Sequence, residues 1–131
     1  MQTERETMID NDNGTVTDES TGLMWQQETI PNNTMSWIQA LSYCERLNLG
    51  GHTDWRLPTI KELLSLVDYS RYNPAINTKY FLDAKSSFYW SSTTAALNED
   101  YAWGVNFEYG HDGLETKKYS YYVRAIRGGK Q

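Results

Sequence analysis

Alternation of large side chains with small or polar ones dominates the last third of the chain and predicts a β-sheet. The pattern has period two over residues 88–92 and again over 101–109. Residues 110–113 have the composition of a turn, and the alternation resumes over residues 119–126. We therefore expect three antiparallel strands. Gly104 lies inside the second strand, which predicts that another backbone segment or ring approaches closely there.

Two short strands are predicted near the N-terminus, at residues 15–17 and 23–26. The intervening residues 18–22 have hairpin-turn chemistry, so the two strands should pair antiparallel and join the C-terminal strand. Residues 1–9 are polar and show no periodic pattern, which is typical of a disordered or frayed terminus. A single domain over residues 10–129 is the expected organisation.

Apolar residues at helical spacing predict two helices between these strand regions. The first is expected to begin with Thr34 as its N-cap, and its apolar stripe contains Trp37, Ile38, Leu41, Cys44 and Leu47. The second is expected to begin at Thr59, which forms a capping box with Glu62 directly after Pro58. Its apolar positions are Leu63, Leu64, Leu66 and Val67. The predicted fold class is α+β, with two helices packed on a twisted antiparallel sheet.

The stretch that separates the two helices contains Trp55 and Arg56 in an extended segment. Trp55 is expected to lie in the core. Arg56 has two interpretations, because its rigid donor fork suits both a structural clamp on carboxylates or carbonyls and a contact with a ligand.

Residues 71–87 fit no regular period and predict a long irregular connection. Such a segment in a compact domain usually binds something or forms a lid. The alternative is that it simply packs on the core through Ile76, Tyr80 and Phe81.

Charge and composition narrow the classes of partner. The formal net charge of −5 disfavours a nucleic-acid partner. The sequence has no apolar run of about 18 residues and no charged-then-apolar start, so we expect neither membrane insertion nor a signal peptide in it. The only cysteine, Cys44, excludes an intrachain disulfide and is expected to be a buried apolar residue.

Few residues are arranged for catalysis or metal binding. His52 and His111 lie in turn-like contexts without a nucleophile or a metal-ligand spacing around them. Asp10, Asp12 and Asp18 have part of the acceptor spacing of a calcium loop, although a plain turn explains the same residues, and the bidentate acid of an EF-hand is missing. No cofactor is expected, and calcium is the one metal that this chemistry would suit.

Several ordered motifs together resemble a known family. They are Gly14-Thr15-Val16-Thr17-Asp18, Thr21-Gly22-Leu23-Met24-Trp25, Gly51-His52-Thr53-Asp54-Trp55-Arg56-Leu57-Pro58-Thr59, Tyr89-Trp90-Ser91-Ser92-Thr93 and Tyr122-Val123-Arg124-Ala125-Ile126-Arg127-Gly128-Gly129. The pattern is similar to the bacterial DUF1566 family, also called the Lcl C-terminal domain. The Arg-Leu-Pro-Thr motif and the C-terminal Val-Arg-x-x-Arg-Gly motif also resemble the formylglycine-generating-enzyme branch of the C-type-lectin-like fold.

This resemblance implies a C-type-lectin-like fold and a non-catalytic ligand-binding or adhesion module, extracellular or in the cell envelope as part of a longer exported protein. The implied partner is a glycan, including sulfated glycans, or a protein. An enzyme related to formylglycine generation is one alternative, but that branch uses a cysteine pair that this chain lacks. An oligomerisation cap that forms a homo-oligomer is the other.

The ligand surface is expected on the C-terminal sheet and its loops, because these positions flank turns and are rich in polar groups and tyrosines. The candidate residues are Asn98, Glu99, Asp100, Tyr109, His111, Asp112, Lys117, Lys118 and Tyr119. Lys117 and Lys118, helped by Lys85 and Arg71, would contact a sulfate, whereas a solvated strand end explains the two lysines equally well. Expected structural residues are Trp55, Arg56, Pro58, Thr59, Glu62, Trp90, Trp103, Arg124 and Arg127.

Overall fold

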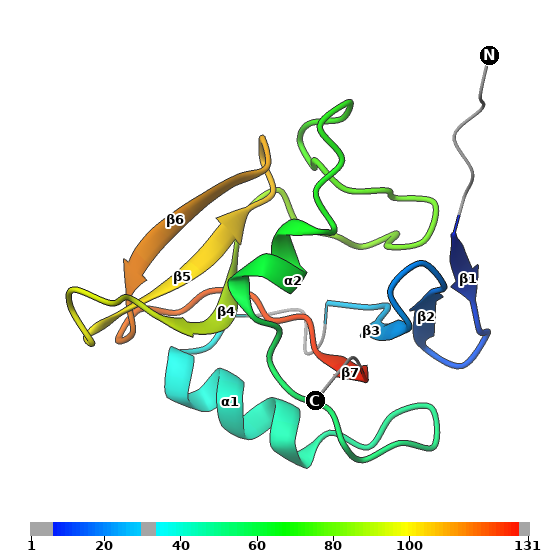
Figure 1. The fold of residues 1–131 in the computed structure, drawn as a ribbon, viewed down its shortest axis with the longest axis horizontal. Helices are drawn as coiled ribbons and strands as arrows, with labels where there is room; N and C mark the ends of the chain where they lie inside the picture. Colours follow the sequence, from blue (N-terminus) through cyan, green and yellow to red (C-terminus); the bar gives the residue numbers. More distant parts are fainter. Residues whose placement is uncertain (1–6, 30–33, 129–131) are drawn as a thin grey trace.

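The computed structural model describes residues 7–29 and 34–128. In this part of the chain the elements are β1 (Met8–Asp10), β2 (Thr15–Asp18), β3 (Leu23–Gln26), α1 (Trp37–Arg46), α2 (Ile60–Leu64), β4 (Phe88–Thr94), β5 (Tyr101–Asn106), β6 (His111–Thr116) and β7 (Ile126–Gly128). They form two antiparallel sheets of order β1-β2-β3-β7 and β4-β5-β6, and Figure 1 shows the two sheets at opposite sides of the molecule. The α+β class is confirmed, but the predicted single sheet is two sheets, and both helices are short.

The first sheet confirms the predicted N-terminal hairpin. β2 pairs with β3 across a turn in which the Gly22 N–H donates to the Asp18 carbonyl at 2.8 Å, and Gly22 has the positive φ of 77° that such a turn requires. β3 also pairs with β7, as expected for the C-terminal strand. The assignment of residues 1–9 to a frayed terminus is wrong for Met8 and Ile9, because β1 pairs with β2 at the sheet edge. Residues 1–6 lie outside the described part of the chain, as does residue 129 at the predicted end of the domain.

The turn predicted at residues 110–113 is instead formed by residues 107–110. The Gly110 N–H donates to the Asn106 carbonyl at 2.9 Å, and the Phe107 N–H donates to the Ser87 carbonyl at 2.9 Å, outside the β5–β6 ladder. β6 therefore begins at His111 and carries part of the predicted turn.

The predicted strand over residues 119–126 is also corrected, since only Ile126–Gly128 belongs to a sheet. Along residues 119–126 the backbone partners change: Tyr121 bridges to Met35, Tyr122 to Tyr89, and Ile126, where β7 begins, to Arg56. Alternation marks this segment as extended, and the changing partners prevent a continuous ladder.

The N-cap of α1 is Ser36 and not Thr34. Met35 is held extended by its pairing with Tyr121, so the helix starts only after that bridge, and Ser36 forms a capping box with Gln39. Cys44 on the inner side is fully buried, as expected, whereas Ile38 on the predicted stripe is 64% exposed. α2 has the predicted capping box of Thr59 and Glu62 but ends at Leu64, before Leu66 and Val67.

The three-stranded sheet is covered on both faces. On one face, Tyr89 and Val105 belong to a cluster with residues of α2, and this cluster also contains Ile76, Tyr80 and Phe81 from the irregular segment. On the other face, Phe88 and Trp90 pack in a cluster with residues of α1 and with Trp55 and Leu57. The packing interpretation of those three residues in the 71–87 segment is therefore confirmed.

Gly104 lies in β5, the central strand of this sheet, where a ring and a backbone segment of β4 come very close. A Cβ atom at Gly104 would be 2.3 Å from both Phe88 Cζ and the Tyr89 carbonyl oxygen. The predicted close approach of a backbone segment and a ring is confirmed, and no side chain fits there.

We predict that Gly104→Ala lowers the free energy of unfolding by at least about 2 kcal/mol, because the Tyr89 backbone cannot move away from the added methyl group. Gly113 lies directly opposite Gly104 in β6 and is the matched control, since a Cβ there would have only Phe88 Cε2 at 4.0 Å. Gly113→Ala should change stability by no more than about 0.5 kcal/mol. Chemical denaturation of both variants tests this, and equal stabilities would contradict the packing described here.

Candidate functional site

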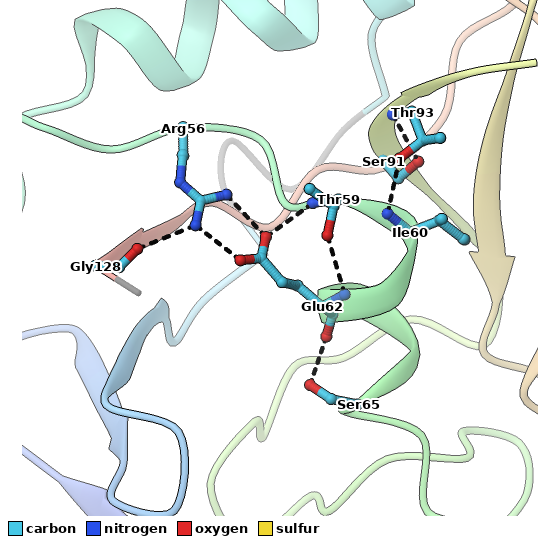
Figure 2. A network of polar contacts seen from close by, with 8 residues as sticks. All are labelled: Arg56, Thr59, Ile60, Glu62, Ser65, Ser91, Thr93 and Gly128. Atoms are coloured by element: carbon cyan, nitrogen blue, oxygen red, sulfur yellow. Dashed lines mark hydrogen bonds and ion pairs between the residues drawn. The ribbon is translucent and has the colours of Figure 1, made fainter. Parts of the chain in front are cut away.

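Arg56 is engaged inside the fold (Figure 2). Its two terminal nitrogens donate to the two carboxylate oxygens of Glu62 at 2.8 Å each, and Nη2 also donates to the Gly128 carbonyl at 3.1 Å. Glu62 Oε1 in turn accepts from the Thr59 N–H at 2.9 Å, so the same carboxylate caps α2. The hydrogen bonds from Arg56 lower the pKa of Glu62. This geometry supports the structural interpretation of Arg56, because both terminal nitrogens of its guanidinium donate to groups within the fold.

The other expected structural residues also bond within the fold. Trp55 is 3% exposed and its indole N–H donates to the Leu49 and His52 carbonyls. Trp90 donates to the Met35 carbonyl, the Trp103 carbonyl accepts from Ser91, and the Pro58 carbonyl accepts from the Ser92 N–H. Arg127 makes a two-pronged ion pair with Asp54 at 2.6 and 3.0 Å. Arg124 is 1% exposed and donates to carbonyls at the end of β3.

The nine predicted ligand residues divide into two groups at opposite ends of the three-stranded sheet. Residues 98–100 and 117–119 lie together, since the Lys117 N–H donates to the Asp100 carbonyl at 2.9 Å. Tyr109, His111 and Asp112 lie at the β5–β6 turn. The register pairs Tyr101 with Thr116 at the first end and Asn106 with His111 at the second. A strand of this length separates the groups by about 17 Å, so they do not form one surface.

The basic residues do not gather into a patch. Lys117 Nζ lies 4.0 Å from the centroid of the Trp37 ring and donates to Thr94 Oγ1 at 3.0 Å, which leaves Lys118 as the exposed cation at this end. Arg71 pairs with Asp68 at 2.9 Å, on the loop beside the opposite end of the sheet. Lys85 precedes β4 close to Tyr89, whose hydroxyl accepts from the Lys85 N–H.

Exposed tyrosines gather at the β5–β6 turn. The rings of Tyr72 and Tyr109 are stacked, with centroids 6.1 Å apart and planes 8° from parallel, although 70% and 56% of the two residues remain exposed. Tyr69 is 74% exposed, and its Cε1 lies 3.7 Å from the ideal Cβ position of Gly110, which places it against the same turn. We call Tyr69, Tyr72 and Tyr109 the tyrosine platform. His111 borders it, with its ring 6.5 Å from that of Tyr109.

Backbone hydrogen bonds fix this platform. The Asn73 N–H donates to the Glu108 carbonyl and the Ala75 N–H to the Phe107 carbonyl, both at 2.6 Å, so the segment after α2 is bonded to the β5–β6 turn. Figure 1 shows this segment next to the turn. The turn also packs tightly on the same segment, because a Cβ at Gly110 would be 2.5 Å from Val67 Cγ1. The rings are thus presented by two segments that hold each other in place.

Sequence reasoning selected Tyr109 and His111 but missed Tyr69 and Tyr72. Both lie among the turn-forming residues that follow α2, where no periodic pattern assigns a side chain to the core. Aromatic residues in a run of turn residues are the signal that could have identified them.

The residues considered for calcium are bonded locally. Asp10 accepts from the Asp12 N–H and from Gln27, and Asp18 accepts from Thr7 and Ser20. Met8 pairs with Asp18 and Asp10 pairs with Val16, so Asp10 of β1 and Asp18 of β2 lie at opposite ends of the paired β1–β2 segment. Residues 7–29 and 34–128 contain no group of three His, Cys, Asp or Glu side chains placed to hold a metal ion.

The fold and these contacts define a small α+β domain of two antiparallel sheets with an exposed tyrosine platform. A family model of the Lcl C-terminal domain matches residues 14–127, and the chain belongs to this family. Comparison with curated proteins gave no match. Within the described ranges, no helix has the length and apolar character needed to cross a membrane.

We predict that Glu62→Gln lowers the free energy of unfolding by about 1 kcal/mol at neutral pH, because it removes the ion pair with Arg56 and weakens the cap of α2. The pKa of Glu62 is lowered in the folded protein, so its stabilising effect is complete above the ordinary glutamate pKa and disappears as the pH falls through the folded value.

Denaturation measured from neutral to acidic pH should therefore show a smaller acid-induced loss of stability in Glu62→Gln than in the wild type. Glu99→Gln, at an exposed loop position, is the control and should keep the full wild-type acid dependence. If the two variants have the same pH profile, Glu62 does not stabilise the fold through its charge.

Proposed function

We propose that this domain is a non-catalytic ligand-binding module, and that its tyrosine platform binds a glycan. The stacked pair of Tyr72 and Tyr109 is the observation that carries the proposal. Both rings remain more than half exposed although the backbone beneath them is hydrogen-bonded, and exposed rings grouped in this way are typical of recognition surfaces. A tyrosine also combines a wide contact area with few rotatable bonds.

The chemistry of the platform suits a sugar ring. A pyranose presents a face of C–H bonds that can lie flat on an aromatic ring, while its hydroxyls reach polar groups at the rim. The exposed side chains next to the rings include Glu108 and Asp112, and the nearby cation Arg71 is paired with Asp68. This charge distribution favours a neutral glycan over a sulfated one at this end of the sheet.

The burial of Cys44 favours a binding role over catalysis of the formylglycine-generating type. Cys44 is fully buried, and burial raises the pKa of its thiol to about 12. A thiol in this environment is a poor nucleophile, since the thiolate is the reactive form.

We further propose that the domain has a C-type-lectin-like fold and acts in adhesion, outside the cell or in the cell envelope. The pairing of the early strand β3 with the last strand β7, and the separate sheet presented by the last third of the chain, are consistent with that fold. Membership of the Lcl C-terminal domain family supports the same assignment.

We predict that a glycan-array screen of the wild-type domain identifies a neutral glycan, and that Tyr72→Ala/Tyr109→Ala weakens its binding by about thirtyfold or more. This is the loss expected when aromatic residues at the centre of a contact are removed. Titration calorimetry with the best array ligand measures it, after a thermal melt has shown that the variant folds like the wild type.

Tyr119→Ala is the matched control, because Tyr119 is 60% exposed but lies at the opposite end of the sheet. It should bind as tightly as the wild type. A different outcome is that sulfated glycans bind, that Lys118→Ala abolishes the binding, and that the platform variant retains it. This result would overturn the proposal and place the site at the basic end, while capture of a protein ligand alone would overturn the assignment of a glycan.

A further inference from the structure

A groove lies beside the tyrosine platform. It has a volume of about 660 Å³, and its lining includes Ser65, Asp68, Tyr69, Ser70, Arg71 and Asn77. This volume is within the range of about 300–1,000 Å³ that is typical of ligand sites in proteins. The groove is open to solvent, so a chain-like ligand could enter it from the side.

Tyr69 belongs to both the groove and the platform. It lines the groove, and its ring edge reaches the ideal Cβ position of Gly110 in the turn that carries Tyr109. The short segment from Tyr69 to Tyr72 therefore passes from the groove to the stacked ring pair. Tyr69 thus connects the groove with the turn that carries the stacked ring of Tyr109.

Hydrogen bonds between neighbouring polar side chains fix their orientation in the groove. Asp68 accepts from the Ser70 hydroxyl at 2.6 Å and from Arg71 Nε at 2.9 Å, and these two bonds fix three side chains of the lining. The charges of Asp68 and Arg71 balance within this group. Such a lining offers donors and acceptors to hydroxyl groups, and it lacks the excess positive charge that a sulfated or phosphorylated chain would require.

We propose that the ligand is a linear, neutral polysaccharide that is bound along its length. One sugar unit lies on the stacked rings of Tyr72 and Tyr109, and the following units cross Tyr69 and enter the groove. This inference rests on the proposed function, because it assigns the chain length and charge class of the glycan that the platform binds.

The experiment measures binding as a function of chain length. Neutral linear oligosaccharides of glucose, mannose, galactose and N-acetylglucosamine are prepared from monosaccharide to hexasaccharide and titrated into the wild-type domain. We expect the affinity for at least one series to rise by about tenfold or more between the monosaccharide and the longer members, because the groove adds contacts beyond the platform. Where the monosaccharide binds too weakly to measure, the disaccharide is the reference.

Two variants separate the groove from the platform. Tyr69→Ala should remove most of the gain in affinity with ligand length, because Tyr69 joins the stacked rings to the groove. Tyr109→Ala should weaken binding at every length. Tyr69 and Tyr109 are both well exposed, so both variants are expected to fold, and Tyr119→Ala serves again as the control.

Each outcome gives a clear answer. Binding that does not increase with length, or a length effect that Tyr69→Ala leaves intact, overturns the extended site while the platform remains. Absence of binding to every neutral series, with the wild-type domain folded, overturns the proposed neutral glycan together with this inference.

Discussion

The fold depends on a buried guanidinium. Arg124 Nη1 donates to the Gln26 and Gln27 carbonyls at 2.7 Å each, and Nη2 donates to Thr29 Oγ1 at 3.0 Å. The guanidinium carbon Cζ of Arg124 lies 4.7 Å from the centroid of the Phe81 ring. Burial lowers the pKa of Arg124, and a charged group without water is tolerated only where such oxygens and rings surround it. The end of β3, the irregular segment and the C-terminal segment must therefore meet at this point.

This meeting point also determines where the candidate site lies. Tyr89 in β4 contacts the same guanidinium, so the second sheet is placed relative to the first. Phe81 and Ile76 are buried in the cluster that includes Tyr89, which fixes the later part of the irregular segment. Earlier in this segment, Asn73 and Ala75 are bonded to the β5–β6 turn. Tyr69 and Tyr72 are thus exposed on the chain segment that leads into this core packing, and Tyr109 is exposed on the turn bonded to it.

Features that depend on neighbours in sequence could be predicted from the sequence, and features that depend on distant partners could not. The Thr59 capping box, the β2–β3 hairpin and the close approach at Gly104 follow from local residue types. The start of α1 is set by the distant partner Tyr121, which holds Met35 extended. The grouping of the candidate ligand residues depends on distant partners in the same way. Residues chosen by turn chemistry lie at both ends of a hairpin, and only the strand register shows which of them are neighbours.

The distribution of cations indicates what kind of recognition this surface can support. Arg56 and Arg127 pair with carboxylates, and Arg71 pairs with Asp68 beside the platform. These three cations are paired within an acidic domain, and tyrosine rings and acidic side chains are exposed at the β5–β6 turn. A ligand bound there would gain mainly from contact area and hydroxyl pairing. Because hydrogen bonds already fix the backbone beneath these rings, little conformational entropy of the backbone would be lost on binding.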